Sequence, residues 1–320
     1  MEKSFLPLVT IVTETYKNFD YLEENIKSVL SQTYAPIEYI IADDGSGNFP
    51  LDKVKKIIKD NKKDNVIDVK FLISKENRGT VTNEGNAYCI AKGAILMPLA
   101  GDDEFYDNNV VSNVVHTFMK TGCEALSVSR VAVNEKKEIA YNLPHKIDYR
   151  RIKSIDTAEK KYYSLVTGKF YNMVSGSTLY IKKDLFHRLG GYDQRFVLWE
   201  DSPFLLKMFS SGVNVETAYN INGIYYRLGG ISTGNINPKY LEDKKTYNTI
   251  LMKEHYNSLP EYVKKYIDHN SKSAKCENTR ERVFLYLSDC KIMLSKAIYA
   301  FNEKVGELID KLLWIFMKKW

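Results

Sequence analysis

Short, continuously apolar runs alternate along the chain with longer segments in which apolar residues recur every three or four positions. Four runs have the length and β-branched content of buried strands. They lie at 8–13, 37–42, 66–73 and 95–99. The segments between them place their apolar residues on one helical face. These helices are expected at 21–31, 51–61 and 80–92. Such alternation predicts a mostly parallel sheet with helices on both faces.

Beyond residue 104 the pattern is less regular. Further strands are predicted at 125–133, 177–181 and 224–227. Helices are predicted at 108–121, from the end of the 177–181 strand to about 189, from about 201, and from 238 onward. The stretch 135–161 is polar and is expected to be a loop.

Acidic turns follow two of the predicted parallel strands. Asp43-Asp44-Gly45-Ser46 follows the second strand, and Gly101-Asp102-Asp103-Glu104 follows the fourth. Ligands of such sheets bind outside the carboxyl ends of the strands. Asp44 is therefore a candidate to accept a hydrogen bond from a base or ribose, the alternative being an ordinary polar turn. Asp102 and Asp103 supply hard oxygen ligands for Mg²⁺ or Mn²⁺ shared with a diphosphate. The alternative for this turn is helix N-capping by Asp103 or Asp107.

A third acidic group is Trp199-Glu200-Asp201-Ser202. An acid beside a large aromatic ring suits a general base next to a platform on which a sugar stacks. An N-cap beside a buried tryptophan explains the same residues without catalysis.

Composition narrows the class of protein. The chain has 320 residues, of which 44% are hydrophobic and 27% charged, and this excludes a disordered or polytopic membrane protein. Its formal net charge of +6 suits an anionic small ligand or membrane face, and no nucleic-acid partner is expected. The four cysteines lack the spacing of a zinc or redox site. With no signal peptide and no apolar run of about 18 residues, a cytoplasmic location is expected.

Eight short motifs occur in a recognisable order over residues 5–235. They are 9–12 with Thr15-Tyr16, 28–34, 40–46, 77–83, 91–93, 99–103, 189–193 with Glu200-Asp201, and Tyr226-Arg227 with Ser232. Together they resemble the family 2 glycosyltransferases. That resemblance implies the GT-A fold, a Rossmann-like α/β domain. It also implies a non-processive enzyme, because the multi-span region and the Gln-x-x-Arg-Trp element of the processive synthases are missing. A single displacement at the anomeric carbon, with inversion, is the expected reaction.

The resemblance also assigns roles to the candidate residues. It places Thr15, Tyr16, Asp44, Asn83 and Asp102 at the nucleotide of a UDP-sugar or dTDP-sugar donor. It places Mn²⁺ or Mg²⁺ at Asp103 and Asp102. Asp201 becomes the general base, with Glu200 as the reserve candidate, and Trp199 and Arg227 contact sugar or acceptor. The implied acceptor is a glycan or lipid-linked glycan in surface polysaccharide synthesis.

Two residues depart from the family pattern. Ala100 stands where the family usually has an acid two residues before Asp102, and Glu14 replaces a small residue. A nucleotidyltransferase is disfavoured because its glycine-rich loop is missing from 12–18. A binding module without catalysis is disfavoured because Asp201 and the Asp102–Asp103 pair are present. We expect a catalytic domain at 1–235, with a nucleotide-sugar half at 1–103 and an acceptor half at 104–235, then a helical region at 236–320.

The C-terminal segment carries its own signal. Apolar residues form one helical stripe at 294, 298, 301, 305, 308, 312 and 316. Residues 291–320 hold six lysines against three acids, and tryptophans lie near the end. This pattern suits a peripheral contact with the headgroups of an anionic membrane. A helix packed on its own domain, or on a second subunit of a homo-oligomer, explains the stripe equally well.

Overall fold

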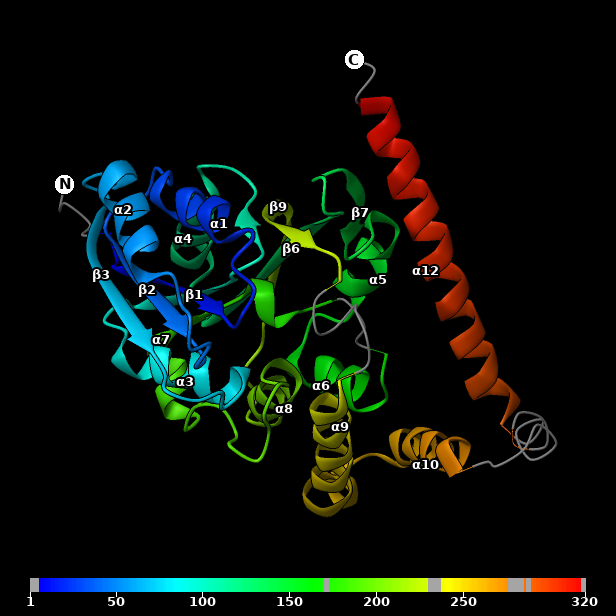
Figure 1. Ribbon diagram of the computed structural model, residues 1–320. Helices are drawn as coiled ribbons and strands as arrows, with labels where there is room; N and C mark the ends of the chain where they lie inside the picture. Colours follow the sequence, from blue (N-terminus) through cyan, green and yellow to red (C-terminus); the bar gives the residue numbers. More distant parts are fainter. Residues whose placement is uncertain (1–5, 170–172, 230–236, 276–284, 286–288, 318–320) are drawn as a thin grey trace.

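The computed structural model describes residues 6–169, 173–229, 237–275, 285 and 289–317 (Figure 1). Ser232, Lys318, Lys319 and Trp320, which the sequence singled out, lie outside these ranges. One curled sheet runs through the body in the strand order β3-β2-β1-β4-β8-β6-β9-β5, with β7 beside β6. The strands are β1 Val9–Thr15, β2 Ile37–Asp43, β3 Val66–Ile73, β4 Ile95–Ala100, β5 Glu104–Phe105, β6 Ala125–Val133, β7 Ile139–Leu143, β8 Leu179–Lys182 and β9 Glu216–Arg227.

Strand direction divides the sheet into two parts. The four strands β3, β2, β1 and β4 are parallel to one another, as predicted. Strand β8 then runs antiparallel to both β4 and β6, and β5 and β7 are antiparallel to their neighbours. Strand β9 pairs in parallel with β6. The α/β fold class is confirmed, and the carboxyl ends of β1, β2 and β4 lie at the same edge.

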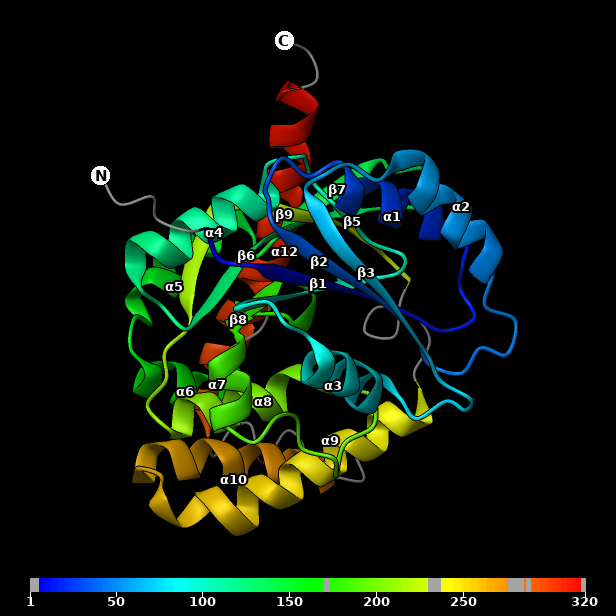
Figure 2. The ribbon, with the colours of Figure 1, turned by 90° about the vertical axis from the view of Figure 1, so that its left-hand side faces the viewer.

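Helices cover both faces of the sheet (Figure 2). They are α1 Leu22–Leu30, α2 Leu51–Asn61, α3 Thr80–Ile90, α4 Val110–Thr121, α5 Tyr149–Ser154, α6 Ala158–Val166, α7 Lys183–Arg188, α8 Asp201–Ser210, α9 Pro238–Ile250, α10 Glu261–Lys275 and α12 Cys290–Met317. Side chains alternate along each strand. On β2, Tyr39 and Ile41 therefore pack with α1, α2 and α4, whereas Ile40 and Ala42 pack with α3 and α8. Burial of both faces explains why these strands read as unbroken apolar runs.

The elements predicted from the sequence differ from the structure in two places. Residues 135–161, predicted as a loop, contain β7, α5 and the start of α6. Strand β7 is apolar at only some positions, and it forms because its backbone pairs with β6. Strand β9 also begins eight residues before the predicted 224, since it extends along β6 from Glu216. In both places pairing with a distant strand outweighs the local pattern.

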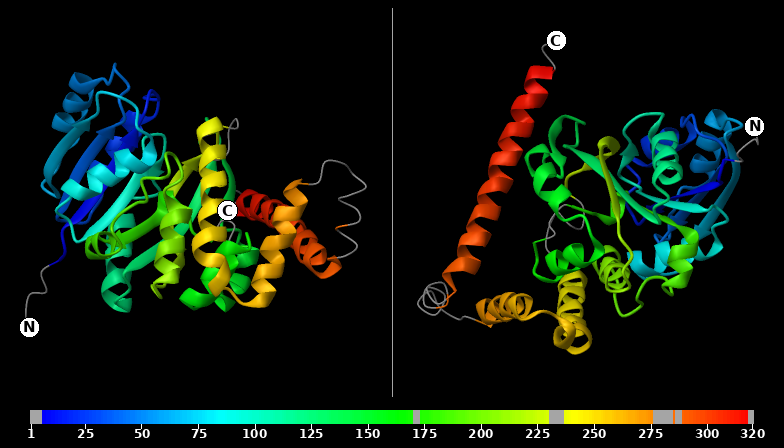
Figure 3. Two further views of the ribbon diagram at one scale, coloured as in Figure 1. Left: turned by 90° about the horizontal axis from the view of Figure 1, so that it is seen from below. Right: turned by 180° about the vertical axis from the view of Figure 1, so that it is seen from behind.

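Helix α12 extends along one side of the body, where it contacts β7 (Figure 1). Asp310 and His145 are both buried, and their Oδ2 and Nδ1 atoms are 2.9 Å apart. Gly306 allows this close approach, because a Cβ there would collide with the His145 ring. Two further views show the helix leaving the body toward its start (Figure 3). Among the described residues, no helix has the length and apolar character needed to cross a membrane.

The apolar stripe of α12 does not face the body. Five of its residues are exposed by 46–68%: Leu294, Ile298, Phe301, Leu308 and Leu312. The packed face instead carries Gly306 and Asp310, well round the helix from the stripe. The helix therefore packs on the body through a face other than the stripe, and most of the stripe is exposed in the described part of the chain, with Val305 half-buried.

Helix α9 fixes the segment that leads into α8. The buried Asp243 carboxylate accepts hydrogen bonds from the backbone N–H groups of Val197 (3.0 Å), Leu198 (2.7 Å) and Trp199 (3.0 Å). Charge-assisted bonds of this kind are about twice as strong as neutral ones. One side chain from the helical region thus holds the three residues directly before Glu200-Asp201.

We expect Asp243→Asn to destabilise the fold by about 2–3 kcal/mol, because an amide offers its NH₂ group to some of these donors and leaves buried N–H groups unpaired. Urea unfolding followed by circular dichroism measures the change. Glu242→Gln is the matched control on the same helix, since Glu242 is exposed and bonds only Lys245 at the surface among the described residues. Equal stability of both variants would contradict this role for Asp243.

Candidate active site

The candidate residues come from the carboxyl ends of β1, β2 and β4, from the start of α8 and from the end of β9. Strand register places Glu14 of β1 beside Ala42 of β2 and Ala100 of β4. The Glu14 carboxylate also interacts electrostatically with Asp44, Glu84 and Glu200. Groups that are far apart in the sequence therefore converge at one end of the parallel strands.

Asp44 is buried and is already hydrogen-bonded. Its two carboxylate oxygens accept from the backbone N–H groups of Arg78 (2.9 Å) and Gly79 (2.8 Å). Gly79 has φ +92°, and a Cβ there would collide with the Val197 carbonyl, so only glycine fits. Burial raises the pKa of Asp44 above its usual value. Asp44 thus joins β2 to the loop before α3, and each oxygen keeps a lone pair for a ligand.

The other candidates on the nucleotide side differ in exposure. Thr15 is buried, and its hydroxyl donates to the Asn18 carbonyl. Tyr16 is 42% exposed, which leaves its ring accessible. Asn83 of α3 is buried; its amide donates to the Ala42 carbonyl, whereas its Oδ1 atom has no hydrogen-bond partner in the described structure. An unpartnered buried acceptor is costly unless a ligand or water pairs with it.

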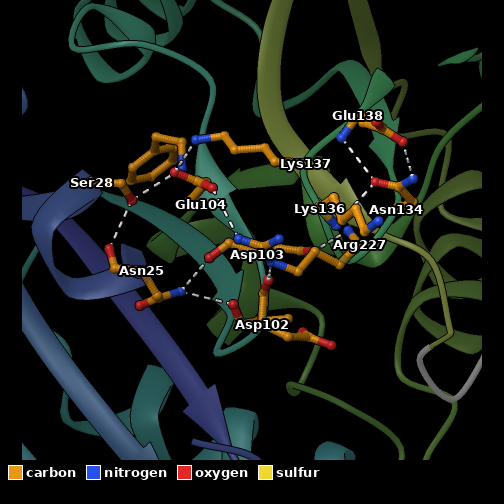
Figure 4. A network of polar contacts seen from close by, with 12 residues as sticks. Asn25, Ser28, Asp102, Asp103, Glu104, Asn134, Lys136, Lys137, Glu138 and Arg227 are labelled. Carbon is orange, nitrogen blue, oxygen red and sulfur yellow. Dashed lines mark hydrogen bonds and ion pairs between the residues drawn. The ribbon is translucent and has the colours of Figure 1, made fainter. Parts of the chain in front are cut away.

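Asp102 and Asp103 lie on the turn between β4 and β5, next to Arg227 of β9 (Figure 4). Asp103 Oδ1 accepts from the Arg227 backbone N–H at 2.9 Å. The Arg227 guanidinium donates to the Asp102 carbonyl at 2.9 Å and to Glu104 Oε1 at 3.2 Å. This network orders the acidic turn, and the predicted sugar-contact residue Arg227 is largely occupied by it.

The acidic turn has the properties of half a metal site. Asp103 Oδ2 is buried without a hydrogen-bond partner among the described residues, and Asp102 is less buried. Burial raises the pKa of both carboxyls, and for Asp103 the neighbouring Asp102 charge raises it further. No cluster of three or more metal-ligating side chains occurs in the described ranges. Two carboxylates fit a Mg²⁺ or Mn²⁺ ion whose remaining ligands come from a diphosphate and water.

Three glutamates close to the site are in an environment that disfavours their charged form. Burial raises the pKa of Glu14 and Glu200 well above the usual value, and it raises the pKa of Glu84 to about 7. Repulsion between these carboxylates adds to the effect. Tyr192 donates a hydrogen bond to Glu84 Oε1 at 2.8 Å. Glu84 is buried, and Glu14 and Glu200 are half-buried. These glutamates therefore tend to keep protons unless a cation or donor approaches.

Asp201, the first residue of α8, is held by three donors. Its Oδ2 atom accepts from the Gly176 N–H at 3.0 Å, and its Oδ1 atom accepts from the N–H of Ser202 at 2.5 Å and its hydroxyl at 3.2 Å. Gly176 also borders Glu200, because a Cβ there would collide with the Glu200 carboxylate. These bonds fix the orientation of the Asp201 carboxylate at the start of the helix.

Trp199 packs against α9. Its ring centroid lies 5.5 Å from Tyr240 and 5.1 Å from Tyr247. This packing, together with the Asp243 bond to its backbone, gives Trp199 a structural role. Its use as a sugar platform remains a proposal.

Sequence reasoning missed three residues near the site. Glu84 and Arg130 are buried charges inside ordinary helix and strand patterns, and Asp243 lies in a helix assigned to the C-terminal region. A charged residue at a position that the apolar period assigns to the interior was the available signal for Arg130. Asp243 had no local signal, because its partners are more than 40 residues away.

Comparisons with known proteins identify the family and the fold. The family model "Glycosyl transferase family 2" matches residues 10–199. The Escherichia coli protein WfaP, named UDP-Glc:alpha-D-GlcNAc-diphosphoundecaprenol beta-1,3-glucosyltransferase, is 33% identical over 118 residues, which cover 36% of this chain and 43% of WfaP. The matched segment is thus less than half of that relative.

Two solved structures share the fold. TarS 1–349 of S. aureus in complex with UDP-GlcNAc has a TM-score of 0.60 at 14% identity, covering 87% of this chain and 79% of that one. The mannosyltransferase PcManGT of Pyrobaculum calidifontis, in complex with GDP-Man and Mn²⁺, has a TM-score of 0.51 at 13% identity, covering 97% and 88%.

The family match spans more than half of the chain and includes both acidic turns at the strand ends. It ends at Trp199, directly before the Glu200-Asp201 pair. The resemblance seen in the sequence motifs is therefore confirmed, and the chain belongs to glycosyl transferase family 2.

Proposed function

We propose that the protein is a metal-dependent, inverting glycosyltransferase that moves a sugar from a UDP-sugar to a hydroxyl group of a glycan or lipid-linked glycan during surface polysaccharide synthesis. The observation that carries the proposal is the convergence of three acidic groups at one end of the sheet. Electrostatic coupling links Glu14 to Asp44 and Glu200, and it links Arg130 to both Asp103 and Asp201. This convergence supports a single substrate complex that contacts the proposed donor, metal and base residues.

The choice of donor and acceptor rests on the relatives. The name of WfaP specifies UDP-Glc as donor and a GlcNAc-diphosphoundecaprenol as acceptor. TarS binds UDP-GlcNAc. We therefore favour UDP over dTDP for this chain, with the exposed Tyr16 ring and the Asp44 carboxylate as contacts of the nucleoside.

Asp102 and Asp103 would hold the divalent cation, and the unpartnered Oδ2 atom of Asp103 supports this assignment. A bound Mn²⁺ or Mg²⁺ neutralises negative charge on a leaving diphosphate. Arg227 keeps the acidic turn in place through its bonds to Asp102 and Glu104. The Mn²⁺ complex of PcManGT is consistent with a metal in this fold.

Asp201 is the proposed general base. Its carboxylate takes the proton of the acceptor hydroxyl as that oxygen attacks the anomeric carbon from the face opposite the leaving diphosphate. One displacement then inverts the anomeric configuration. The backbone donors at Gly176 and Ser202 keep Asp201 oriented before the transfer.

UDP with Mn²⁺ or Mg²⁺ is expected to raise the melting temperature, because ligand at 100 times its dissociation constant stabilises a protein by about 2.7 kcal/mol. Thermal melts with UDP, dTDP and GDP, each with metal or EDTA, measure this. Asp102→Asn should remove the metal-dependent part of the shift. Asp64→Asn, an exposed control, should leave it intact. The donor assignment would be wrong if no nucleotide shifted the melt.

Asp201→Asn should keep UDP affinity but lower turnover by roughly 10²-fold or more, because the amide preserves shape and removes the proton acceptor. Turnover is read as UDP released with a synthetic lipid-linked N-acetylglucosamine diphosphate as acceptor. Glu200→Gln is the matched comparison. Burial raises the pKa of Glu200, so this carboxyl tends to keep its proton and is expected to be a poorer base than Asp201 at neutral pH. If the two phenotypes were exchanged, Glu200 would be the base.

The exposed stripe of α12 is proposed to dock on an anionic membrane. Lys304 and Lys311 lie seven residues apart and are both exposed along one flank of the stripe. Asp310 and Gly306 fix the opposite side of the helix to the body. Lipid-facing apolar residues beside lysines suit an anionic headgroup surface, where each lysine contributes about 1 kcal/mol.

Phe301→Asp combined with Leu308→Asp should abolish flotation with phosphatidylglycerol vesicles, and the wild type should float with these and not with phosphatidylcholine. Met119→Asp is the control, because Met119 is 52% exposed on α4 and outside the stripe. Equal flotation of all three proteins would contradict the docking. A wild-type dimer that the double variant dissociates, measured by light scattering, would identify the stripe as a subunit contact instead.

A further inference from the structure

Arg130 on β6 is a buried cation. The residue is 6% exposed, and its guanidinium lies over the Tyr226 ring, 4.9 Å from the centroid. Burial lowers the pKa of this guanidinium. Apart from the contact with Tyr226, the described part of the chain offers it no hydrogen bond and no ion pair at contact distance.

Other buried cations of the protein are paired. Arg227, also nearly buried, donates to Glu104 and to the Asp102 carbonyl. Lys161 donates to Asn214 at 2.7 Å and to the Val215 carbonyl at 2.6 Å. A buried charge without such partners costs several kcal/mol. Arg130 is thus a nearly buried guanidinium that has no protein hydrogen-bond partner among the described residues.

The surroundings of Arg130 place it beside the reaction centre. Its charge interacts with Asp103 of the acidic turn and with Asp201, the proposed base, although neither is near enough for an ion pair. Tyr226 and Tyr141 also interact with it. Tyr141 belongs to β7, the strand that α12 contacts. Arg130 therefore lies within electrostatic range of the proposed base, on a strand that pairs with β7, which α12 contacts.

We propose that Arg130 binds a phosphate group of the acceptor, so that the acceptor is a phosphate-linked glycan whose hydroxyl reaches Asp201. The guanidinium fork matches phosphate oxygens in a bidentate manner, and it is the side chain best suited to this contact in a buried place. This inference rests on the proposed glycosyl transfer and adds the substrate class that the site accepts.

The donor diphosphate is a less suitable partner. The cation of the donor diphosphate is assigned to Asp102 and Asp103. Arg227 lies next to this pair and is hydrogen-bonded to both residues. Arg130 comes from the neighbouring strand, and its second carboxylate neighbour is Asp201, which serves the acceptor. A phosphate of the acceptor would supply the missing anion and bring the nucleophilic hydroxyl to the base.

The first test separates binding from structure. Arg130→Met keeps the volume and removes the charge, and Arg130→Lys keeps the charge and removes the fork. Because the unpaired cation destabilises the free protein, the unliganded Arg130→Met variant should melt at or above the wild-type temperature. Arg188→Met is the surface control, since Arg188 is exposed and paired with Glu124. A clear fall in melting temperature for Arg130→Met would make Arg130 a structural residue and overturn the proposal.

The second test measures phosphate recognition with the protein saturated by UDP and Mg²⁺. N-acetylglucosamine 1-phosphate and its methyl glycoside present the same sugar with and without phosphate. Calorimetry should show that the wild type prefers the phosphate by about 10-fold or more. Arg130→Met should lose that preference, Arg130→Lys should retain part of it, and Arg188→Met should retain all of it.

Two outcomes would overturn the assignment. In the first, the wild type binds both sugars with equal affinity. In the second, Arg130→Met lowers the affinity for UDP by the same factor as the affinity for the phosphosugar, which would mean that Arg130 contacts the donor diphosphate. A wild-type protein that does not bind UDP in the presence of metal would contradict the proposed function itself, and this outcome is distinct from the other two. Loss of phosphate preference with UDP affinity unchanged supports the acceptor assignment alone.

Discussion

The concentration of carboxyl groups at the carboxyl ends of β1, β2 and β4 is the constraint on which the rest of the site depends. Burial raises the pKa of Glu14, Asp44, Glu84, Asp103 and Glu200. Such an arrangement is unfavourable in the free protein. Under the proposed function, a divalent cation and the hydrogen-bond donors of a nucleotide sugar would offset this unfavourable electrostatic energy.

Hydrogen bonds from backbone N–H groups stabilise several acidic side chains of the site. Asp44 is held by the N–H groups before α3, Asp201 by those at Gly176 and Ser202, and Asp243 by those before α8. Each carboxylate joins two segments that are distant in the sequence. The bonds that stabilise the acids are therefore the same bonds that set the geometry of the site, and the helical region contributes to it through Asp243.

The sequence predicted the parallel half of the sheet well, because both faces are buried and the strands are unbroken apolar runs. It also singled out Asp44, Asp102, Asp103 and Asp201 as candidates, since acids directly after such strands or at a helix start are visible as local motifs. It did not predict β7 or the full length of β9, which form by pairing with β6. The bonds of Asp243 and the surroundings of Arg130 depend on contacts between distant segments, and no local pattern records them.

We propose that the acidic turn binds its divalent cation together with the nucleotide. Titration of Mn²⁺ by electron paramagnetic resonance, with and without saturating UDP, tests this proposal, because coupling between two ligands is reciprocal. We expect weak Mn²⁺ binding to the free protein and binding about 10-fold or more tighter with UDP, a coupling of about 1.4 kcal/mol. Mn²⁺ binding that is unaffected by UDP, or absent in both conditions, would contradict it.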